Sequence, residues 1–328
     1  MKLFVTSAGF LTTVQDLGRP GFRRFGVSVG GALDSHAFRL GNLLVGNEET
    51  AAGLEITLGG SRLNLPDERL VAWCGGNFDV RVGSLSLPAG RAAVMCAGEE
   101  LSIKQPKVGC RAWLAISGGV DVPKVLESRS TDLRSNFGGL VGRPLRDGDA
   151  MSLGEKSARA ESLVDKLRQN RTASWSAPQN WASPAQAEPV LRITQGVDWS
   201  RFNDSAQRAL TNETFTVSPD SDRMGARLAG PVLQRNDDVD LVSEAVAPGT
   251  IQVPPSGNPI LLLGDCQTIG GYPKIAHVLT VDLPMAAQLR ASDRVRFREV
   301  SLVEAHRLLY ERERHLEQFR VGIKLHMP

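Results

Sequence analysis

The chain has 328 residues, of which 41% are hydrophobic and 23% are charged, and its formal net charge at pH 7 is +2. This length allows one large domain or two of ordinary size. The nearly balanced charge gives no reason to expect nucleic acid or an anionic membrane as a partner. No stretch reaches the roughly 18 apolar residues of a membrane-spanning helix, and the segment after Met1 lacks the apolar core of a targeting signal. We therefore expect a cytoplasmic protein.

The cysteines and histidines are scattered along the chain. Cys74, Cys96, Cys110 and Cys266 lie far apart and form no CxxC pair, and the five histidines form no cluster. This spacing argues against a zinc site and against a disulfide framework. We expect no bound metal and four reduced thiols, most of them buried.

In the first half of the chain, the pattern indicates two helices and two strands. Asp34 can cap a helix whose apolar residues recur over residues 37–44. Residues 101–104 alternate between apolar and polar, whereas residues 112–116 form the apolar run of a central strand. Apolar residues within 163–167 indicate the second helix.

The second half opens with residues 170–189, which are polar, rich in Ala, Ser and Pro, and aperiodic. Such a segment predicts a linker or a long surface loop. Alternating or apolar runs follow at residues 191–194, 215–217, 259–263 and 295–297. Ser301 and Glu304 form a possible capping box for a C-terminal helix. Short strands between turn residues predict a mainly β (β-rich) fold with a few helices, as a sandwich or a barrel.

A weak internal repeat indicates two similar halves. Residues 112–126 are AWLAISGGVDVPKVL, and residues 259–279 are PILLLGDCQTIGGYPKIAHVL. Both contain an apolar strand, a Gly pair and a Pro-Lys, which is consistent with duplication. The alternative is that β-rich proteins reuse the same turn chemistry. We expect a first domain over residues 1–169, a linker or surface loop over 170–189, and a second domain with the C-terminal helix over 190–328.

Several common signatures of enzyme sites are absent from the sequence. It has no GxxxxGK[ST] phosphate loop, so we do not expect this chain to bind ATP by that route. It also has no GxSxG nucleophile elbow and no HExxH motif. Five stretches that combine glycine with polar side chains are the remaining candidates for a site.

Two of these stretches lie in the first half, at residues 13–34 and 126–133. Arginine can hold a carboxylate or carboxyphosphate in a bidentate fork, and glycine lets backbone N–H groups approach an anion. The alternatives are a turn with a surface ion pair, and hydroxyl groups that cap the local backbone. The candidate residues are Gln15, Asp16, Arg19, Arg129, Ser130 and Thr131.

The other three stretches lie in the second half, at residues 218–230, 243–260 and 264–275. The first places Asp222 beside Arg223, for which a fold-stabilising ion pair is the alternative. The second holds Glu244, a candidate general base if it is desolvated. The third is GDCQTIGGYPKI, whose candidates are Asp265, Gln267, Gly270, Gly271, Tyr272 and Lys274. Together the stretches predict a cleft for a small planar substrate that carries an amide or a carboxylate.

The order of these motifs resembles the biotin-dependent carboxyltransferase family. The matching stretches are TVQDLGRPGFRRFGV, ALDSHAFRLGNLLVGN, LEITLGG, SRST, SDRMGARLAG, VAPGTIQVPPSGNPI and QTIGGYPKIAHV, from about Leu11 to Ala305. The family includes allophanate hydrolase subunit 2, the C-type subunit of 5-oxoprolinase and the matching half of the carboxyltransferase domain of urea carboxylase. This sequence has Cys266 where the family commonly has Arg.

The resemblance implies two cyclophilin-like β-barrel domains and a cyclophilin-like partner, the B-type subunit of 5-oxoprolinase, joined by a third subunit of the A type. Such a complex uses ATP to open a lactam, 5-oxoproline, to glutamate. One alternative is a carboxyltransferase that moves carboxyl from carboxybiotin, with biotin on a separate carrier, to urea or a related amide. The other is a non-catalytic regulatory protein that binds the cyclophilin-like partner.

Under the oxoprolinase hypothesis, each candidate residue has an expected role. Arginines that hold a carboxylate or a phosphorylated intermediate are Arg19, Arg129 and Arg223. Candidates for catalytic proton transfer are Asp222, Glu244 and Asp265. Residues that orient the amide are Gln15, Gln267, Tyr272 and Lys274. The substrate-binding set is completed by Asp16, Ser130, Thr131, Gly270 and Gly271.

Overall fold

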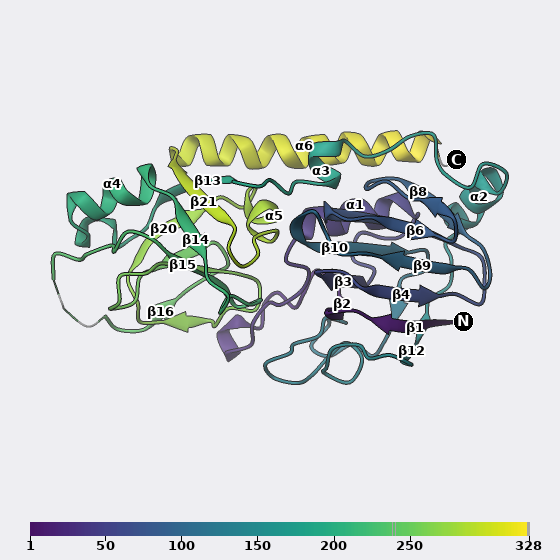
Figure 1. Ribbon diagram of the computed structural model, residues 1–328, viewed down its shortest axis with the longest axis horizontal. Helices are drawn as coiled ribbons and strands as arrows, with labels where there is room; N and C mark the ends of the chain where they lie inside the picture. The colour runs from purple at the N-terminus through teal and green to yellow at the C-terminus, as the bar shows by residue number, and fades with distance from the viewer. Residues whose placement is uncertain (238, 240, 327–328) are drawn as a thin grey trace. The chain divides into compact units, whose positions relative to one another are not determined.

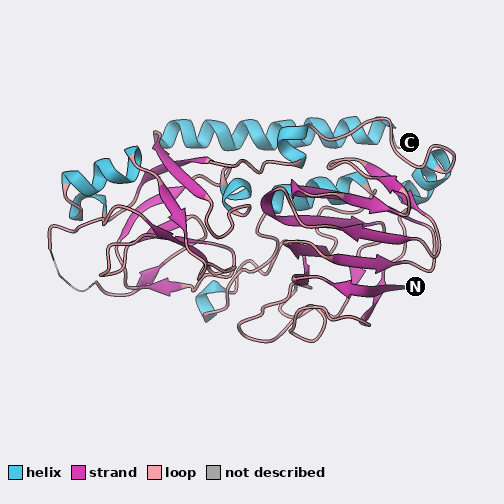
Figure 2. Ribbon diagram, in the orientation of Figure 1, coloured by secondary structure: helices cyan, strands magenta, loops and turns pink. Residues whose placement is uncertain are grey.

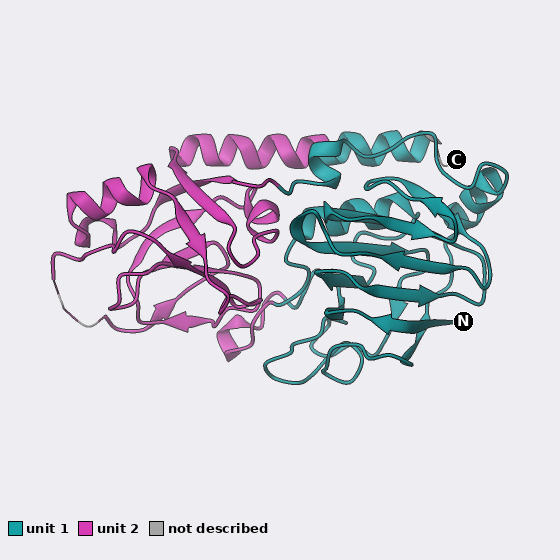
Figure 3. Ribbon diagram, in the orientation of Figure 1, with its two compact units in different colours: residues 1–19, 30–185, 316–328 teal, residues 20–29, 186–315 magenta. Residues whose placement is uncertain are grey.

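The computed structural model describes residues 1–237, 239 and 241–326, and the fold is mainly β (Figure 2). The prediction of a β-rich chain with a few helices is therefore confirmed. The chain divides into two compact units (Figure 3). Unit 1 comprises residues 1–19, 30–185 and those from 316 onward, and unit 2 comprises residues 20–29 and 186–315. The units are interleaved in the sequence, and the predicted domains 1–169 and 190–328 stay a prediction.

Unit 1 is built on two antiparallel sheets (Figure 1). One has the order β11 (Val120–Asp121), β12 (Ala150–Leu153), β1 (Lys2–Ala8), β4 (Ser61–Asn64), β9 (Glu100–Ile103), β6 (Val80–Val82) and β7 (Leu85–Ser86). The other has the order β2 (Leu11–Gln15), β3 (Gly53–Thr57), β10 (Val108–Ile116), β5 (Arg69–Asn77) and β8 (Ala92–Met95). The predicted apolar run 112–116 lies in β10, which is buried almost throughout because β3 and β5 flank it.

The helices of unit 1 are α1 (Ser35–Leu44), α2 (Ala158–Leu167) and the short α3 (Gln179–Ala182). Asp34 caps α1 by accepting a hydrogen bond from Ala37 N at 2.8 Å, as its position before the apolar periodicity predicts. Ser157 caps α2 in the same way. The apolar stripes that predicted both helices face the core, since Leu40, Leu44 and Leu163 are buried.

Unit 2 contains a closed barrel. Its strands follow the order β13 (Val190–Gln195), β20 (Lys274–Val278), β17 (Thr250–Gln252), β18 (Ile260–Leu262), β15 (Gly225–Ala229), β14 (Phe215–Val217) and β21 (Arg294–Glu299). A parallel pair between β13 and β21 closes the barrel, and the other pairs are antiparallel. Closure leaves no open strand edge, and Phe215 packs on Phe297 in the interior.

A separate two-stranded element of unit 2, which we call the ribbon, consists of β16 (Glu244–Ala245) and β19 (Ile269–Gly270). Around the barrel lie α4 (Asp204–Asn212), α5 (Leu283–Ala286), and the 3-10 turns η1 (Arg23–Phe25) and η2 (Trp199–Arg201). Among the described residues, no helix is long and apolar enough to cross a membrane.

The C-terminal helix α6 (Leu302–His326) is a single long helix that belongs to unit 2 through His315 and to unit 1 from Leu316 (Figures 1 and 3). Its start is capped as predicted, because Glu304 N donates to Ser301 Oγ at 3.1 Å.

The last part of α6 is attached to unit 1 through a shared carboxylate. Glu49 accepts hydrogen bonds from Arg39 Nε at 2.6 Å and from Arg320 Nε at 2.7 Å. Burial alone would raise the pKa of Glu49, but the hydrogen bonds and charges of the two guanidinium groups outweigh it, so the pKa lies below its ordinary value of 4.5. The ionised form of Glu49 therefore stabilises this contact.

We expect Glu49→Gln to reduce the acid sensitivity of the fold. Because its folded-state pKa is lowered, Glu49 contributes stability above its unfolded pKa, and this contribution is lost as the pH falls through the folded pKa. Urea unfolding from about pH 6 to about pH 3 should therefore show a larger loss of unfolding free energy in the wild type than in the variant. Glu48→Gln, at the exposed neighbouring carboxylate, is the matched control. Equal acid sensitivity of wild type and Glu49→Gln would contradict this role.

Candidate functional site

In unit 1, the structure brings two of the predicted stretches together around Asp16, which follows β2. One carboxylate oxygen of Asp16 accepts from Ser128 Oγ at 2.6 Å and from Ser130 Oγ at 2.5 Å. The other accepts from Arg129 N at 2.6 Å. The loop at residues 128–130 thus binds an anion, but this anion is the chain's own Asp16. The hydroxyl groups are engaged within the fold, and substrate binding by Asp16 and Ser130 stays a prediction.

The same cluster contains Arg19 and Gln15. Arg19 is fully buried, donates from Nη2 to Ser130 O at 2.5 Å, and lies over the ring of Phe137 at 4.7 Å. Gln15 Nε2 donates to Thr131 O at 3.1 Å. Gln15 Oε1 is buried and has no hydrogen-bond partner among the described residues. These contacts hold the loop against β2, and the clamping role expected of Arg19 stays a prediction.

The side chain of Arg129 points elsewhere and forms an ion pair with Asp121, with Nη2 at 2.7 Å from Oδ1. Exposed pairs of this kind contribute little to stability. The six candidates of the first half therefore share one region of unit 1, but only Arg129 extends its charged group to a partly exposed position.

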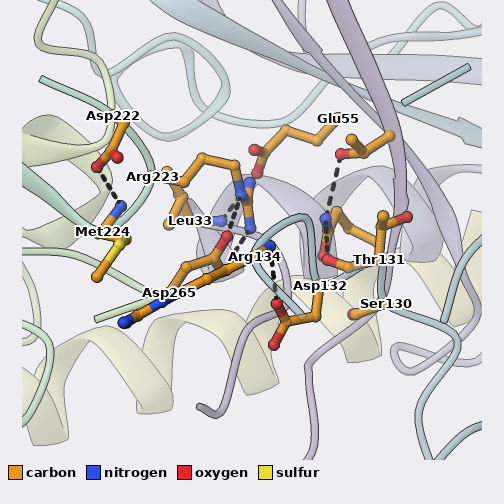
Figure 4. A network of polar contacts seen from close by, with 12 residues as sticks. Leu33, Glu55, Ser130, Thr131, Asp132, Arg134, Asp222, Arg223, Met224 and Asp265 are labelled. Carbon is orange, nitrogen blue, oxygen red and sulfur yellow. Dashed lines mark hydrogen bonds and ion pairs between the residues drawn. The ribbon is translucent and has the colours of Figure 1, made fainter. Parts of the chain in front are cut away.

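In unit 2, Arg223 and Asp265 form a bidentate ion pair, with Nε–Oδ2 at 2.8 Å and Nη2–Oδ1 at 3.1 Å (Figure 4). Each side chain is only 6% exposed. The sequence suggested a pair between Arg223 and its neighbour Asp222, but Asp222 instead accepts from Met224 N at 2.7 Å and closes the turn before β15 (Figure 4). Arg223 thus forms a fold-stabilising ion pair, but with Asp265 rather than with Asp222. The catalytic roles of Asp222 and Asp265 stay predictions.

Lys274, the first residue of β20, carries a buried positive charge. Its Nζ lies 2.8 Å from Glu244 Oε2 and 3.5 Å from Asp198 Oδ2, and its backbone N donates to Asp198 at 2.9 Å. Burial by itself lowers the pKa of Lys274. The hydrogen bond and charge of Glu244 and the charge of Asp198 raise the pKa by more than burial lowers it, so the pKa lies above its ordinary value. Lys274 is therefore a cation at neutral pH, suited to hold an anionic or carbonyl oxygen rather than to accept a proton.

Two carboxamides lie next to this lysine. Gln252 is paired with Lys274 across β17 and β20, so the two side chains share a face. Gln252 Nε2 donates to Tyr272 O at 3.2 Å, and Gln252 Oε1 accepts from Gln267 Nε2 at 3.3 Å. This chain of hydrogen bonds orients both amides. A Cβ at Gly270 would lie 2.8 Å from Gln252 Nε2, so a larger residue there would displace this amide.

We call Asp198, Glu244, Gln252, Gln267 and Lys274 the Lys274 site. Sequence reasoning found three of these residues and missed Asp198 and Gln252 as site members. A polar residue that follows the alternating strand 191–194 was the available signal for Asp198. Among the described residues, no group of three or more His, Cys, Asp and Glu side chains is placed to hold a metal ion.

This β-barrel unit with a buried lysine and two carboxamides occurs in a chain whose residues 25–299 match the family model of the carboxyltransferase domain, subdomain A and B. The chain belongs to that family, and the resemblance seen in its motifs is confirmed. Among named relatives, the 5-oxoprolinase C subunit of Escherichia coli is 38% identical over 96% of this chain and 97% of that protein. The protein of the same name from Haemophilus influenzae is 35% identical over 94% of each.

A solved structure with a similar fold is the urea carboxylase of Kluyveromyces lactis. Its TM-score is 0.87 at 28% sequence identity, and the match covers 97% of this chain and 29% of that one. This chain thus corresponds to one part of a much longer carboxylase, whereas it spans nearly the whole of the two bacterial relatives.

Proposed function

We propose that this chain is one component of an ATP-dependent 5-oxoprolinase complex, which hydrolyses 5-oxoproline to glutamate in the cytoplasm. The observation that carries the proposal is the nearly full-length likeness to two proteins that are named as the C subunit of 5-oxoprolinase. The word subunit in this name supports an assembly with other chains. We propose that these are a cyclophilin-like partner of the B type and a third component of the A type. Because this chain has no phosphate-loop motif, we assign ATP to the complex.

The chemistry of the Lys274 site supports a lactam as the substrate. 5-Oxoproline has a carboxylate and a ring carbonyl, which bind to a cation or a hydrogen-bond donor. It also has a ring N–H, which binds to a hydrogen-bond acceptor. Lys274 supplies the cation and Gln267 supplies both a donor and an acceptor. We assign Lys274 to the oxygen on which negative charge develops, because a fixed cation stabilises that charge in a partly buried site. Glu244 has a side chain that is 62% exposed, so the desolvation expected of a general base is not met, and it is our candidate for proton transfer through its position beside Lys274.

A second candidate is transfer of a carboxyl group from carboxybiotin, borne by a separate carrier, to urea or a related amide. The likeness to urea carboxylase of K. lactis favours it. A planar amide nitrogen next to a carbonyl is common to both substrates, so the same carboxamides suit either.

The deciding experiment is co-purification of the chain with its two partner subunits, followed by an assay of glutamate release from 5-oxoproline. We expect release that requires ATP and stops when this chain is omitted. A complete complex without ATP-dependent release would refute the oxoprolinase function. Consumption of carboxybiotin that depends on urea would then favour the second candidate.

A further inference from the structure

A short segment from the first half of the chain belongs to unit 2. Residues 20–29 leave unit 1 and carry η1, whose three residues include Arg23 (Figure 3). Gly26 ends this turn in the left-handed conformation with φ of 81°, and its N–H donates to Arg23 O at 2.9 Å. Glycine adopts this conformation without strain. The turn therefore sets the direction in which the Arg23 side chain leaves the backbone.

Arg23 reaches the apolar cluster of Val246, Leu262 and Cys266, all of which are buried. Its Nη2 donates to Val246 O, and its Nη1 is buried as well. Burial raises the pKa of the Cys266 thiol, and the nearby charge of Arg23 partly offsets this effect. The guanidinium thus bonds one point of the chain, Val246 O, and carries its charge near a second, Cys266, twenty residues further along.

These two points are the base of the ribbon. Val246 directly follows β16, and its N–H donates to Thr268 O at 3.1 Å, next to the first residue of β19. Cys266 directly precedes Gln267. A two-stranded element has little stability of its own, so its geometry depends on how its base is held.

We propose that Arg23 is a positioning residue for the Lys274 site. By binding Val246 O, whose own residue donates from its N–H to Thr268 O, it fixes the end of β16, which carries Glu244, against the start of β19, which follows Gln267. Its catalytic consequence rests on the proposed function, whereas its effect on the ribbon does not. The residue occurs in the sequence motifs without any predicted role, because its targets lie more than 220 residues further along the chain.

The first test uses the isolated chain and hydrogen exchange by mass spectrometry. We expect Arg23→Ala to speed exchange in peptides that cover residues 244–246 and 267–270 by roughly tenfold, because the ribbon opens locally. Arg23→Lys retains a donor and a charge. The exchange rate of these peptides in Arg23→Lys should therefore lie between the rates of the wild type and of Arg23→Ala. Arg24→Ala is the matched control, because Arg24 is exposed and lies over the ring of Phe25. Unchanged ribbon exchange in Arg23→Ala, or an equal increase across all barrel strands, would overturn the proposal.

The second test uses the complex with its partner subunits. Arg23→Ala should lower kcat by roughly tenfold to a hundredfold, since small displacements of catalytic groups have effects of this size. Arg23→Lys should restore part of this loss, and Arg24→Ala should leave kcat unchanged. A loosened ribbon with wild-type kcat and KM would show that Arg23 does not position the site. If the wild-type complex fails to hydrolyse 5-oxoproline, the proposed function fails, and the exchange experiment still decides whether Arg23 holds the ribbon.

Discussion

Lys274→Met should reduce the turnover of the assembled enzyme by roughly a hundredfold or more, an effect typical of removing a fixed group that stabilises developing charge. Methionine retains the aliphatic stem, so the packing of β20 is preserved while the cation is lost. Glu244 and Asp198 then remain as carboxylates without their common partner. The measurement is steady-state kinetics of glutamate release, with circular dichroism to verify the fold.

The choice of lysine offers a second readout and a control. Lys274 is the one lysine in the sequence ranges 20–29 and 186–315, which otherwise contain arginine as their cation. NMR of isotope-labelled lysine, with Lys274→Met to assign the signal, therefore reports on Lys274 as the one lysine of unit 2, and bound 5-oxoproline should shift that signal. Lys166→Met, at an exposed position of α2, should leave turnover unchanged. Turnover of Lys274→Met close to that of Lys166→Met would exclude Lys274 from the chemistry.

Asp265→Asn should lower the free energy of unfolding by roughly 3–5 kcal/mol, the size expected when one partner of a buried ion pair is removed. The buried Arg223 guanidinium then loses the ionised acceptor of its Nε and Nη2 contacts with Asp265. Chemical denaturation, combined with hydrogen exchange of β18, measures the loss where it arises.

Replacing both partners separates the energetic role of this ion pair from a catalytic one. Arg223→Met combined with Asp265→Leu should be more stable than Asp265→Asn, because apolar side chains can replace a buried pair at little cost. Asp220→Asn, at an exposed carboxylate of the same unit, serves as the control. If Asp265→Asn is as stable as this control, the ion pair between Arg223 and Asp265 does not contribute to the stability of the fold.

Local features of the chain could be predicted because the interacting groups are neighbours in sequence. Asp34 and Ser301 were expected to cap helices, and each accepts a hydrogen bond from an N–H three residues further on. The run 112–116 was expected to be a central strand, and it is flanked on both sides in its sheet. Periodicity and capping depend on spacings of two to four residues, which any sequence displays directly.

The partners of polar residues could not be predicted in this way. An ion pair of Arg223 with adjacent Asp222 was one of the alternatives that the sequence left open, and Arg223 pairs with Asp265 instead, 42 residues away. Anion binding by the loop at residues 128–130 was one of two alternatives, and the loop instead holds the carboxylate of Asp16, more than 110 residues before it. Both outcomes depend on which strands the topology brings together, and several topologies satisfy the same local pattern.

The sequence alone therefore determined the fold class, the starts of α1 and α6 and the stretches in which polar chemistry gathers, because these follow from side-chain type and short spacing. Only the tertiary structure decided which of those polar groups face one another. Lys274 became the centre of the candidate site through Asp198, 76 residues before it, and Arg23 reaches Val246, beside the ribbon, from the first half of the chain. Closing the barrel and holding the ribbon at its base set these contacts, and neither leaves a trace in local sequence.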